Sequence, residues 1–251
     1  MSRSALCVLV AGLLFGGTAA AQTKAPAPTP KKNEPKKSAP VASAPAKRDY
    51  SGRKLFIGGV QLGYNAGIAL HASIMFENLA QGLPFALRLG YGHTWSNPGD
   101  PLAARRVFID NNTNGEPQSS GDNWDLRFDL LYPVKIASLQ RSKVFGGMRY
   151  NDFTAAFAYI GGNETFDVNG NQWGVGGGVE TAFALSPIVD MTFSVGADYY
   201  FKSGLDGHDS YYYPDGSGEN TIANYTYADA DDAINQPDFN ARVLMGVAYR
   251  F

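Results

Sequence analysis

The chain has 251 residues, of which 21 are Lys or Arg and 23 are Asp or Glu, so its formal net charge at pH 7 is −2. Charged residues make up only 18% of it, whereas glycine occurs 29 times and aromatic residues account for 13%, a composition typical of all-β proteins with short turns. The single cysteine, Cys7, lies near the N-terminus, which excludes disulfides, thiol catalysis and cysteine-ligated metals from the rest of the chain.

Residues 1–21 have the pattern of a secretory signal peptide, in which Arg3 precedes a short apolar core and Ala19–Ala21 offers a small-residue cleavage site. That core, Leu6–Phe15, is shorter than the roughly 20 apolar residues that a membrane-spanning helix needs. Residues 22–49 are rich in proline, alanine and lysine and cannot bury a core, so we expect a disordered tether there. The net charge is split, because residues 22–48 carry seven basic residues against the single Glu34, whereas residues 49–251 contain 13 basic and 22 acidic residues.

From residue 50 onward, apolar residues recur at every second position in runs separated by turn residues, which is the period of a β-strand. The last stretch, Phe239–Phe251, alternates an apolar set that begins and ends with Phe against a set of small or charged residues. The apolar phase slips near Asn151–Asp152, which predicts a β-bulge. We expect eight strands, at about residues 54–64, 68–77, 85–95, 124–132, 143–159, 173–185, 191–201 and 239–251.

The expected connections form two sets. In an antiparallel barrel one end would carry the long connections, residues 96–122, 160–171 and 203–237, and the other end the shorter ones, residues 78–84, 133–142 and 186–190. An even number of strands lets the sheet close without free edges. An apolar outer face, a polar interior and long loops gathered at one end are typical of membrane barrels.

With the signal peptide, the strand count and the terminal Tyr249-Arg250-Phe251, residues 50–251 resemble the small eight-stranded outer-membrane β-barrels of Gram-negative bacteria. This porin-like class contains the OmpA transmembrane domain and the OmpX-like proteins. The resemblance implies an all-β, antiparallel transmembrane barrel in the outer membrane, with its long loops outside and the tether in the periplasm. It also implies that Tyr249 and Phe251 form the assembly signal read by the outer-membrane insertion machinery. The basic tether is the candidate for contact with peptidoglycan.

An eight-stranded barrel is just wide enough for side chains to fill its interior. The inward-facing positions carry charges of both signs, which predicts an ion-pair network that plugs the lumen. A narrow, charge-lined conduit is the alternative interpretation. The expected members of the network are Glu77, Arg88, Asp125, Arg127, Asp129, Arg149, Glu180, Asp198, Lys202 and Arg242.

Two loops carry candidate ligands for Ca²⁺ or Mg²⁺. The run Asp110–Gly115 matches the first half of a calcium loop, although its twelfth position is Gly121 rather than Glu. Residues 203–237 combine carboxylates and tyrosines without Lys or Arg, which suits cations that bridge lipopolysaccharide phosphates, or a cationic partner; a solvated loop is the alternative. The candidate ligands are Asp110, Asn112, Asn114, Asp206, Asp209, Asp215, Asp229, Asp231 and Asp232.

These features favour a non-enzymatic outer-membrane protein without a cofactor, in a structural or surface-binding role, with residues 96–122 and 203–237 as its contact surface. The alternatives are a passive narrow channel for small solutes and a lipid-modifying enzyme. For the enzyme, His208-Asp209-Ser210 resembles the catalytic pair of outer-membrane lipid A deacylases, and Glu219 is the nearest candidate for the orienting acid. Nucleic-acid binding is disfavoured because no basic face is expected outside the tether.

Overall fold

The computed structural model describes residues 55–80, 82–109, 114–136, 139–162, 164–208, 210–218 and 225–251. These residues belong to the second of the chain's two units, Lys47–Phe251. The expected signal peptide and tether lie outside the described residues.

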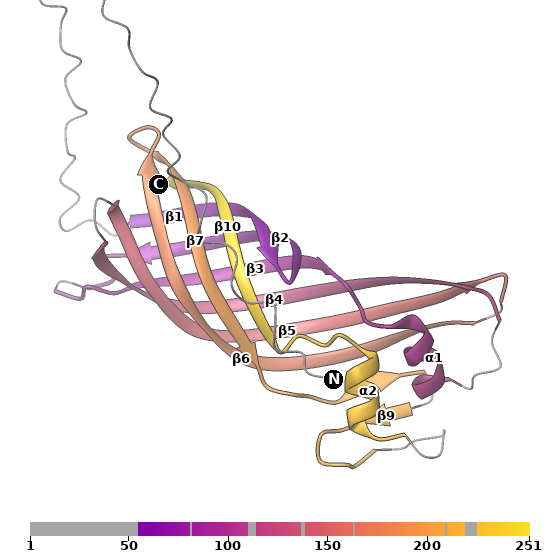
Figure 1. Ribbon diagram of the computed structural model, residues 1–251. Coiled ribbons are helices and arrows are strands. Elements are labelled where there is room, and N and C mark those ends of the chain that lie inside the picture. The colour runs from indigo at the N-terminus through magenta and orange to yellow at the C-terminus, as the bar shows by residue number, and fades with distance from the viewer. Residues whose placement is uncertain are drawn as a thin grey trace, which may run out of the picture. The chain divides into compact units, whose positions relative to one another are not determined.

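Eight long antiparallel strands of the described part of the chain form a closed barrel (Figure 1), as the sequence predicts. Each strand pairs with its neighbours in sequence, and the closing strand β10 pairs with β1 from Ile57↔Arg250 to Asn65↔Arg242. The sheet therefore has no free edge within the barrel wall. The strands are β1 (Leu55–Asn65), β2 (Gly67–Glu77), β3 (Ala86–Ser96), β4 (Glu116–Ile136), β5 (Leu139–Ile160), β6 (Thr165–Ala184), β7 (Val189–Tyr200) and β10 (Phe239–Arg250).

The barrel exposes its large apolar side chains and buries its charged ones. On β10, Phe239, Val243 and Met245 are exposed, whereas Asn240 and Arg242 on the alternate positions are buried. The same alternation repeats on the other strands, so a continuous apolar belt surrounds a polar interior. A soluble domain rarely exposes such a surface, whereas a barrel in lipid requires it.

Strands β4, β5 and β6 are longer than expected, with 21, 22 and 20 residues, and they extend well beyond the other strands (Figure 1). The expected long loop of residues 160–171 is therefore wrong, because β5 reaches Ile160 and β6 begins at Thr165. The other two long connections contain α1 (Pro101–Phe108), β8 (Leu205–Gly207), β9 (Ser210–Tyr212) and α2 (Tyr227–Ala233). Neither of these two helices is long and apolar enough to cross a membrane, and the described residues contain no other that is.

The expected β-bulge at Asn151–Asp152 is also wrong. The register of β5 with both β4 and β6 runs without interruption through these two residues, and the shift between β4 and β5 lies at Val134/Ile136 instead. The apolar phase slips because the environment inverts along one regular strand. Before Asn151, Val144 and Met148 of β5 are exposed on the outer face, and Phe145 is the large apolar side chain that points inward. After Asn151, the inward positions carry Phe153, Phe157 and Tyr159, which are buried.

Candidate functional site

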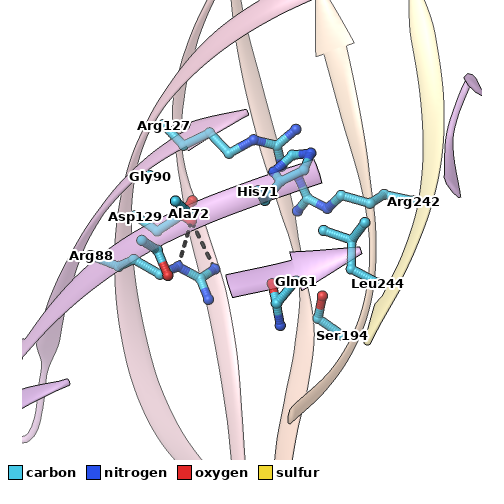
Figure 2. Close-up of a pocket in the computed structure, with 11 residues that line it drawn as sticks. Gln61, His71, Ala72, Arg88, Gly90, Arg127, Asp129, Ser194, Arg242 and Leu244 are labelled. Carbon is cyan, nitrogen blue, oxygen red and sulfur yellow. Dashed lines mark hydrogen bonds and ion pairs between the residues drawn. The ribbon is translucent and has the colours of Figure 1, made fainter. Parts of the chain in front are cut away.

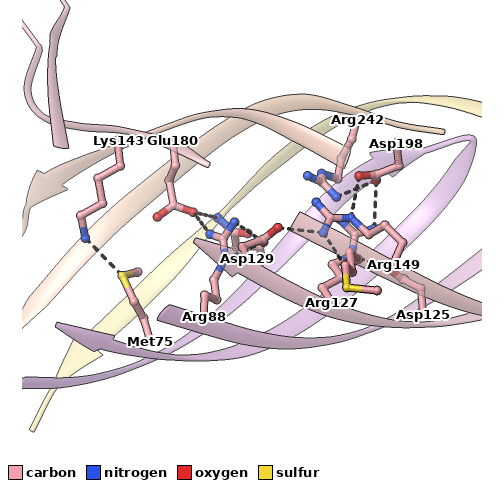
Figure 3. A network of polar contacts seen from close by, with 12 residues as sticks. Met75, Arg88, Asp125, Arg127, Asp129, Lys143, Arg149, Glu180, Asp198 and Arg242 are labelled. Carbon is pink, nitrogen blue, oxygen red and sulfur yellow. Dashed lines mark hydrogen bonds and ion pairs between the residues drawn. The ribbon is translucent and has the colours of Figure 1, made fainter. Parts of the chain in front are cut away.

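The barrel interior holds a connected network of ion pairs, drawn in Figure 3. Its four arginines and four carboxylates balance in charge, and all eight are at most 8% exposed. The members are Arg88, Asp125, Arg127, Asp129, Arg149, Glu180, Asp198 and Arg242.

Asp129 on β4 and Arg149 on β5 join the two halves of this network. Arg88 Nη2 lies 2.8 Å from Asp129 Oδ2, and Arg88 Nη1 lies 2.7 Å from Glu180 Oε2. Arg149 donates from Nη1 to Asp129 Oδ1 at 2.7 Å and from Nε to Asp198 Oδ1 at 2.8 Å. The Arg88–Glu180 and Arg149–Asp198 pairs therefore cross the lumen between strands that are not neighbours in the sheet.

Asp198 on β7 is the carboxylate with the most arginine partners in this network. It accepts from Arg149 and, at 2.7 Å, from Arg242 Nη1. Arg127 Nη2 lies 3.3 Å from Asp198 Oδ2, close enough for an ion pair but without the geometry of a hydrogen bond. Arg127 also donates to Asp125. Three arginines thus depend on one fully buried carboxylate.

Glycines make the room for these side chains. Across the sheet, Arg127 faces Gly90, Asp125 faces Gly92, Arg242 faces Gly196, and Asp198 faces Gly176. A Cβ atom at Gly176 would lie 1.9 Å from Asp198 Oδ1 and 2.9 Å from Arg149 Nε. The long side chains fold across the lumen because their cross-strand neighbours have none.

Gly176→Ala is therefore expected to destabilise the barrel by about 1–3 kcal/mol, the usual cost of overpacking a filled interior. Gly146→Ala on the adjacent strand is the matched control, because the nearest atom to its added Cβ would be 3.8 Å away. Urea unfolding of both variants in lipid vesicles measures the difference. Equal stabilities would contradict the account of a tightly packed lumen.

Two of the ten residues expected in the network lie elsewhere. Glu77 pairs with Lys143, which also contacts Met75 Sδ at 3.2 Å, near the short-turn end. Lys202 is not in the lumen, which corrects the prediction. It follows the end of β7, its side chain is 54% exposed, and its Nζ lies 2.5 Å from Asp231 of α2. The alternation that places Asp198 inward ends at Tyr200, so it could not be extended to residue 202.

The pairing with Asp231 affects the titration of Lys202. The hydrogen bond to Asp231 and the charge of that carboxylate raise the pKa of Lys202 above its ordinary value of 10.5. The contact is therefore fully formed below pH 10.5 and is lost as the pH rises through the raised pKa. NMR titration of the lysine side chain should show this pKa fall back toward 10.5 in Asp231→Asn. An unchanged pKa would show that the two groups do not pair.

A second charged cluster, not predicted from the sequence, lies at the short-turn end. Asp190 at the start of β7 is 2% exposed and accepts from Arg141 Nη1 at 2.7 Å and from Arg250 Nε at 2.9 Å. This cluster ties the closing strand β10 to β5 and β7. Its signal was the inward phase that Asp190 shares with Thr192 and Ser194.

The inward residues of β5 show the order of layers along the lumen. Phe145 comes first and belongs to an apolar cluster at the short-turn end. Arg149 of the network follows. The network contacts the apolar cluster through Arg88, whose guanidinium lies 4.7 Å from the centre of the Phe145 ring. Asn151 then faces Gln172 of β6 across the sheet, and these two side chains form a layer of buried amides. Phe153 begins a second apolar core. The first cluster contains Leu55, Ile57, Met75, Ala86, Leu131, Phe145 and Ala248.

A cavity of about 20 Å³ remains beside the network (Figure 2). His71, Arg88, Arg127 and Arg242 contribute to its lining, together with Gln61. A site of this size holds about one water molecule. Water there would serve buried polar atoms that have no partner within the protein, such as His71 Nε2 and Arg242 Nε. The ion-pair network and this small cavity therefore share this part of the lumen.

The second apolar core forms a cap at the end with the long strands. The inner faces of β5 and β6 pack against α1, α2, β8 and β9, and the residues involved are at most 7% exposed. We call this assembly the cap. Its core consists of Ala104, Val107, Phe108, Ile109, Phe153, Ala155, Phe157, Tyr159, Phe166, Val168, Leu205, Tyr212, Ala230, Ala233 and Ile234.

Backbone contacts hold the two helices of the cap together. Asp100 N donates to Ala233 O and Asn235 N donates to Pro98 O, both at 2.9 Å, so the start of α1 is tied to the end of α2. The Asp100 side chain caps α1 by accepting from Leu102 N at 2.9 Å. Gln172 on β6 donates to Pro237 O at 2.9 Å and joins the cap to the buried amide layer. The cap is an ordered structure rather than a set of loops.

The candidate metal ligands are dispersed. Asp229 forms a capping box with Thr226 at the start of α2, and its acceptance of those hydrogen bonds lowers its pKa. Asp215 accepts from Ser217, and Asp231 pairs with Lys202. Among the described residues no group of three or more His, Cys, Asp or Glu side chains is placed to hold a metal ion. Asn114, Asp206 and Asp232 are described, whereas Asp110, Asn112 and Asp209 lie outside the described residues.

The His208–Ser210 pair lies at the turn between β8 and β9. Ser210 is completely buried in the cap, whereas His208 is exposed, and Ser210 N donates to His208 O at 2.9 Å. Asp209 and Glu219 lie outside the described residues. In this arrangement the Ser210 side chain is enclosed by the protein and is not accessible to lipid.

The terminal residues expected to form the assembly signal lie at the short-turn end of the barrel. Phe251 N donates to Phe56 O at 2.9 Å, and the rings of Tyr249 and Phe251 meet edge to face with centroids 4.8 Å apart. Both side chains are exposed, 43% and 76%. The C-terminal aromatic pair is thus presented on the outer surface.

A closed eight-stranded antiparallel barrel with a filled polar lumen and an apolar belt defines an outer-membrane β-barrel protein. No protein-family model and no curated protein sequence matches the chain. Among solved structures, it is similar to a major outer membrane protein from Thermus thermophilus, with 25% identity and a TM-score of 0.65 over 79% of this chain and 100% of that one.

Two further structures also match. Neisserial surface protein A has 13% identity and a TM-score of 0.37 over 79% of this chain and 96% of its own. Ail, the attachment invasion locus protein of Yersinia pestis, has 9% identity and a TM-score of 0.41 over 79% and 97%.

Proposed function

We propose that this outer-membrane barrel is a non-conducting, non-enzymatic surface protein that binds a cationic partner through its cap. The observation that carries the proposal is the contrast between the barrel lumen and the cap. The lumen is filled by a neutral ion-pair network, whereas an ordered cap with its own core stands beyond the barrel wall. The long-strand end would face the cell exterior, and the short-turn end the periplasm.

The chemistry of the cap supports a basic partner. The chain from Ser203 to Ala241 contains no Lys or Arg. In the described part of this segment, the side chains of Asp206, Asp215 and Asp232 are exposed. The rings of Tyr211 and Tyr213 are also exposed, at 40% and 45%. Exposed carboxylates attract a positively charged surface, and tyrosines provide contact area at low entropic cost.

Binding of fluorescent oligolysine to the folded, detergent-solubilised protein tests this function. We expect saturable binding that weakens with added salt and is lost when Asp206, Asp215 and Asp232 are all changed to Asn. A variant with Glu116→Gln, Glu164→Gln and Asp167→Asn, whose side chains lie outside the cap core, is the matched control. Binding that does not depend on the cap carboxylates would contradict the proposal.

Three further contacts belong to the same proposal. Tyr249 and Phe251 would be bound by the outer-membrane insertion machinery during assembly. The basic residues of the tether would contact peptidoglycan or the anionic inner surface of the outer membrane. Divalent cations bound to the acidic loops would link the protein to lipopolysaccharide phosphates.

A further inference from the structure

Charge is distributed unevenly around the small cavity beside the ion-pair network (Figure 2). Three arginines, Arg88, Arg127 and Arg242, line this cavity, against one carboxylate, Asp129. The other three carboxylates of the network lie outside the lining. The network is neutral as a whole, but the cavity is surrounded by an excess of positive charge.

The lining also contains hydrogen-bond donors that have no acceptor. Among the described residues, His71 Nε2, Arg127 Nη2 and Arg242 Nε are buried without a hydrogen-bond partner, and the three residues are at most 7% exposed. Figure 2 shows the His71 ring between the guanidinium ends of the other two. Arginine nitrogens can only donate, and Nε2 of a histidine donates in one of its tautomers. Because a buried donor without a partner is costly, these atoms indicate that an acceptor occupies the cavity.

The acceptors of the lumen are committed or lie elsewhere. Asp129 accepts from Arg88 Nη2 at 2.8 Å through Oδ2 and from Arg149 Nη1 at 2.7 Å through Oδ1. The buried oxygens without a partner among the described residues, such as Asp125 Oδ2 and Asn151 Oδ1, belong to residues outside the lining. A water molecule in the cavity would need acceptors for its hydrogens. An anion needs donors alone, and donors are what the lining leaves unpaired.

We propose that this cavity binds a small monovalent anion, chloride, through His71, Arg127 and Arg242. Burying an anion is unfavourable unless charge-assisted hydrogen bonds offset the loss of water, and guanidinium groups supply such bonds. The cavity, of about 20 Å³, has room for one monatomic ion and excludes polyatomic oxyanions such as sulfate. This site lies in the lumen and does not rest on the proposed binding at the cap.

The histidines allow a direct test, because His71 alone among the three in the chain lines the cavity. Isotope-labelled protein would be refolded from urea into a neutral maltoside detergent at a series of chloride concentrations, with gluconate holding the ionic strength constant at one pH. We expect a saturable change in the side-chain NMR signal of His71, as a shift or as a second resonance, and none for His93 and His208. Sulfate in place of chloride should leave His71 unchanged.

Removing one donor should weaken the effect of chloride on stability. Since a ligand that binds only the folded state stabilises it, the urea midpoint of the wild type should rise as chloride replaces gluconate. His71→Leu is expected to raise the apparent Kd for chloride about tenfold, the scale of one hydrogen bond to a charged group, and so to remove most of this rise.

His93→Leu is the matched control, the same substitution on the neighbouring strand β3 and outside the lining, and it should keep the full rise. Heat-modifiable gel mobility verifies that each variant is folded. Ser73→Ala, which removes a hydroxyl from the lining, serves if His71→Leu does not fold.

Three results would overturn the proposal. A His71 signal that does not respond to chloride would mean that water is the occupant. Equal responses to chloride and sulfate, or equal responses of all three histidines, would mean a general effect of salt. An equal rise of the urea midpoint in folded His71→Leu and His93→Leu would exclude the cavity as the site. None of these results depends on oligolysine binding at the cap, so the two proposals fail separately.

Discussion

Replacing Asp198 with alanine is expected to lower the free energy of unfolding of the barrel by about 3–5 kcal/mol, the range for removing one partner of a buried ion pair. Asp198 is completely buried and neutralises Arg149 and Arg242, with Arg127 close by. Its loss would leave an excess positive charge in a lumen closed to bulk water at both ends. Urea unfolding in lipid vesicles, followed by tryptophan fluorescence, measures the change.

The matched control for Asp198→Ala is Asp167→Ala, an exposed carboxylate on the neighbouring strand β6. A double variant, Asp198→Ala/Arg242→Met, should recover part of the lost stability, because it removes one of the stranded charges. If Asp198→Ala were as stable as Asp167→Ala, the interior would be solvated rather than plugged.

Replacing Phe108 with alanine is expected to unfold the cap while leaving the barrel intact. Phe108 of α1 is 1% exposed, and its ring lies 5.3 Å from that of Tyr212 and 6.3 Å from that of Phe166. Truncating a buried phenylalanine costs about 3–5 kcal/mol, a large share of what a core of this size can supply. Hydrogen exchange should accelerate in α1, α2 and β9 and stay slow in β1, β2 and β10.

Leu102→Ala provides the control for this variant, because Leu102 lies on the same helix but is 44% exposed. It should leave exchange in the cap unchanged. Loss of protection in the barrel strands of Phe108→Ala would show that cap and barrel fold as one unit. Unchanged protection in the cap would show that its helices are held by backbone contacts alone.

The barrel and most of its interior network could be predicted from the sequence because one rule governs both. Inside lipid, a period of two places apolar residues such as Val243 and Met245 outward and charged residues such as Arg242 inward. The number of strands followed from the runs themselves. Eight of the ten residues expected in the lumen do lie in one network, each on a strand inside the belt.

The rule fails where the strands leave the belt. From Phe153 to Tyr159 the inward face of β5 becomes apolar, because there it packs on the cap and its outward face meets water. The period of two is unchanged, but the chemistry of the two faces is exchanged. If apolar residues are assumed to face outward along the whole strand, this exchange looks like a β-bulge, and the strands appear shorter than they are.

The cap was missed although local signals were present. Asp100-Pro101 is an N-cap residue followed by proline at the first helical position, which predicts the start of α1. Thr226 and Asp229 have the spacing of a capping box, which predicts the start of α2. What these signals could not give is the docking of both helices on β5 and β6, since it depends on contacts such as that of Phe108 with Phe166.

Single-channel recording in planar lipid bilayers is the most direct test of the central claim that the lumen is plugged and the cap is the working surface. The folded wild-type protein, with insertion verified by heat-modifiable mobility, should add no reproducible conductance steps in either polarity. Regular, stepwise openings that recur between preparations would contradict the claim, because the Arg88–Glu180 and Arg149–Asp198 ion pairs cross the lumen and would have to break for ions to pass.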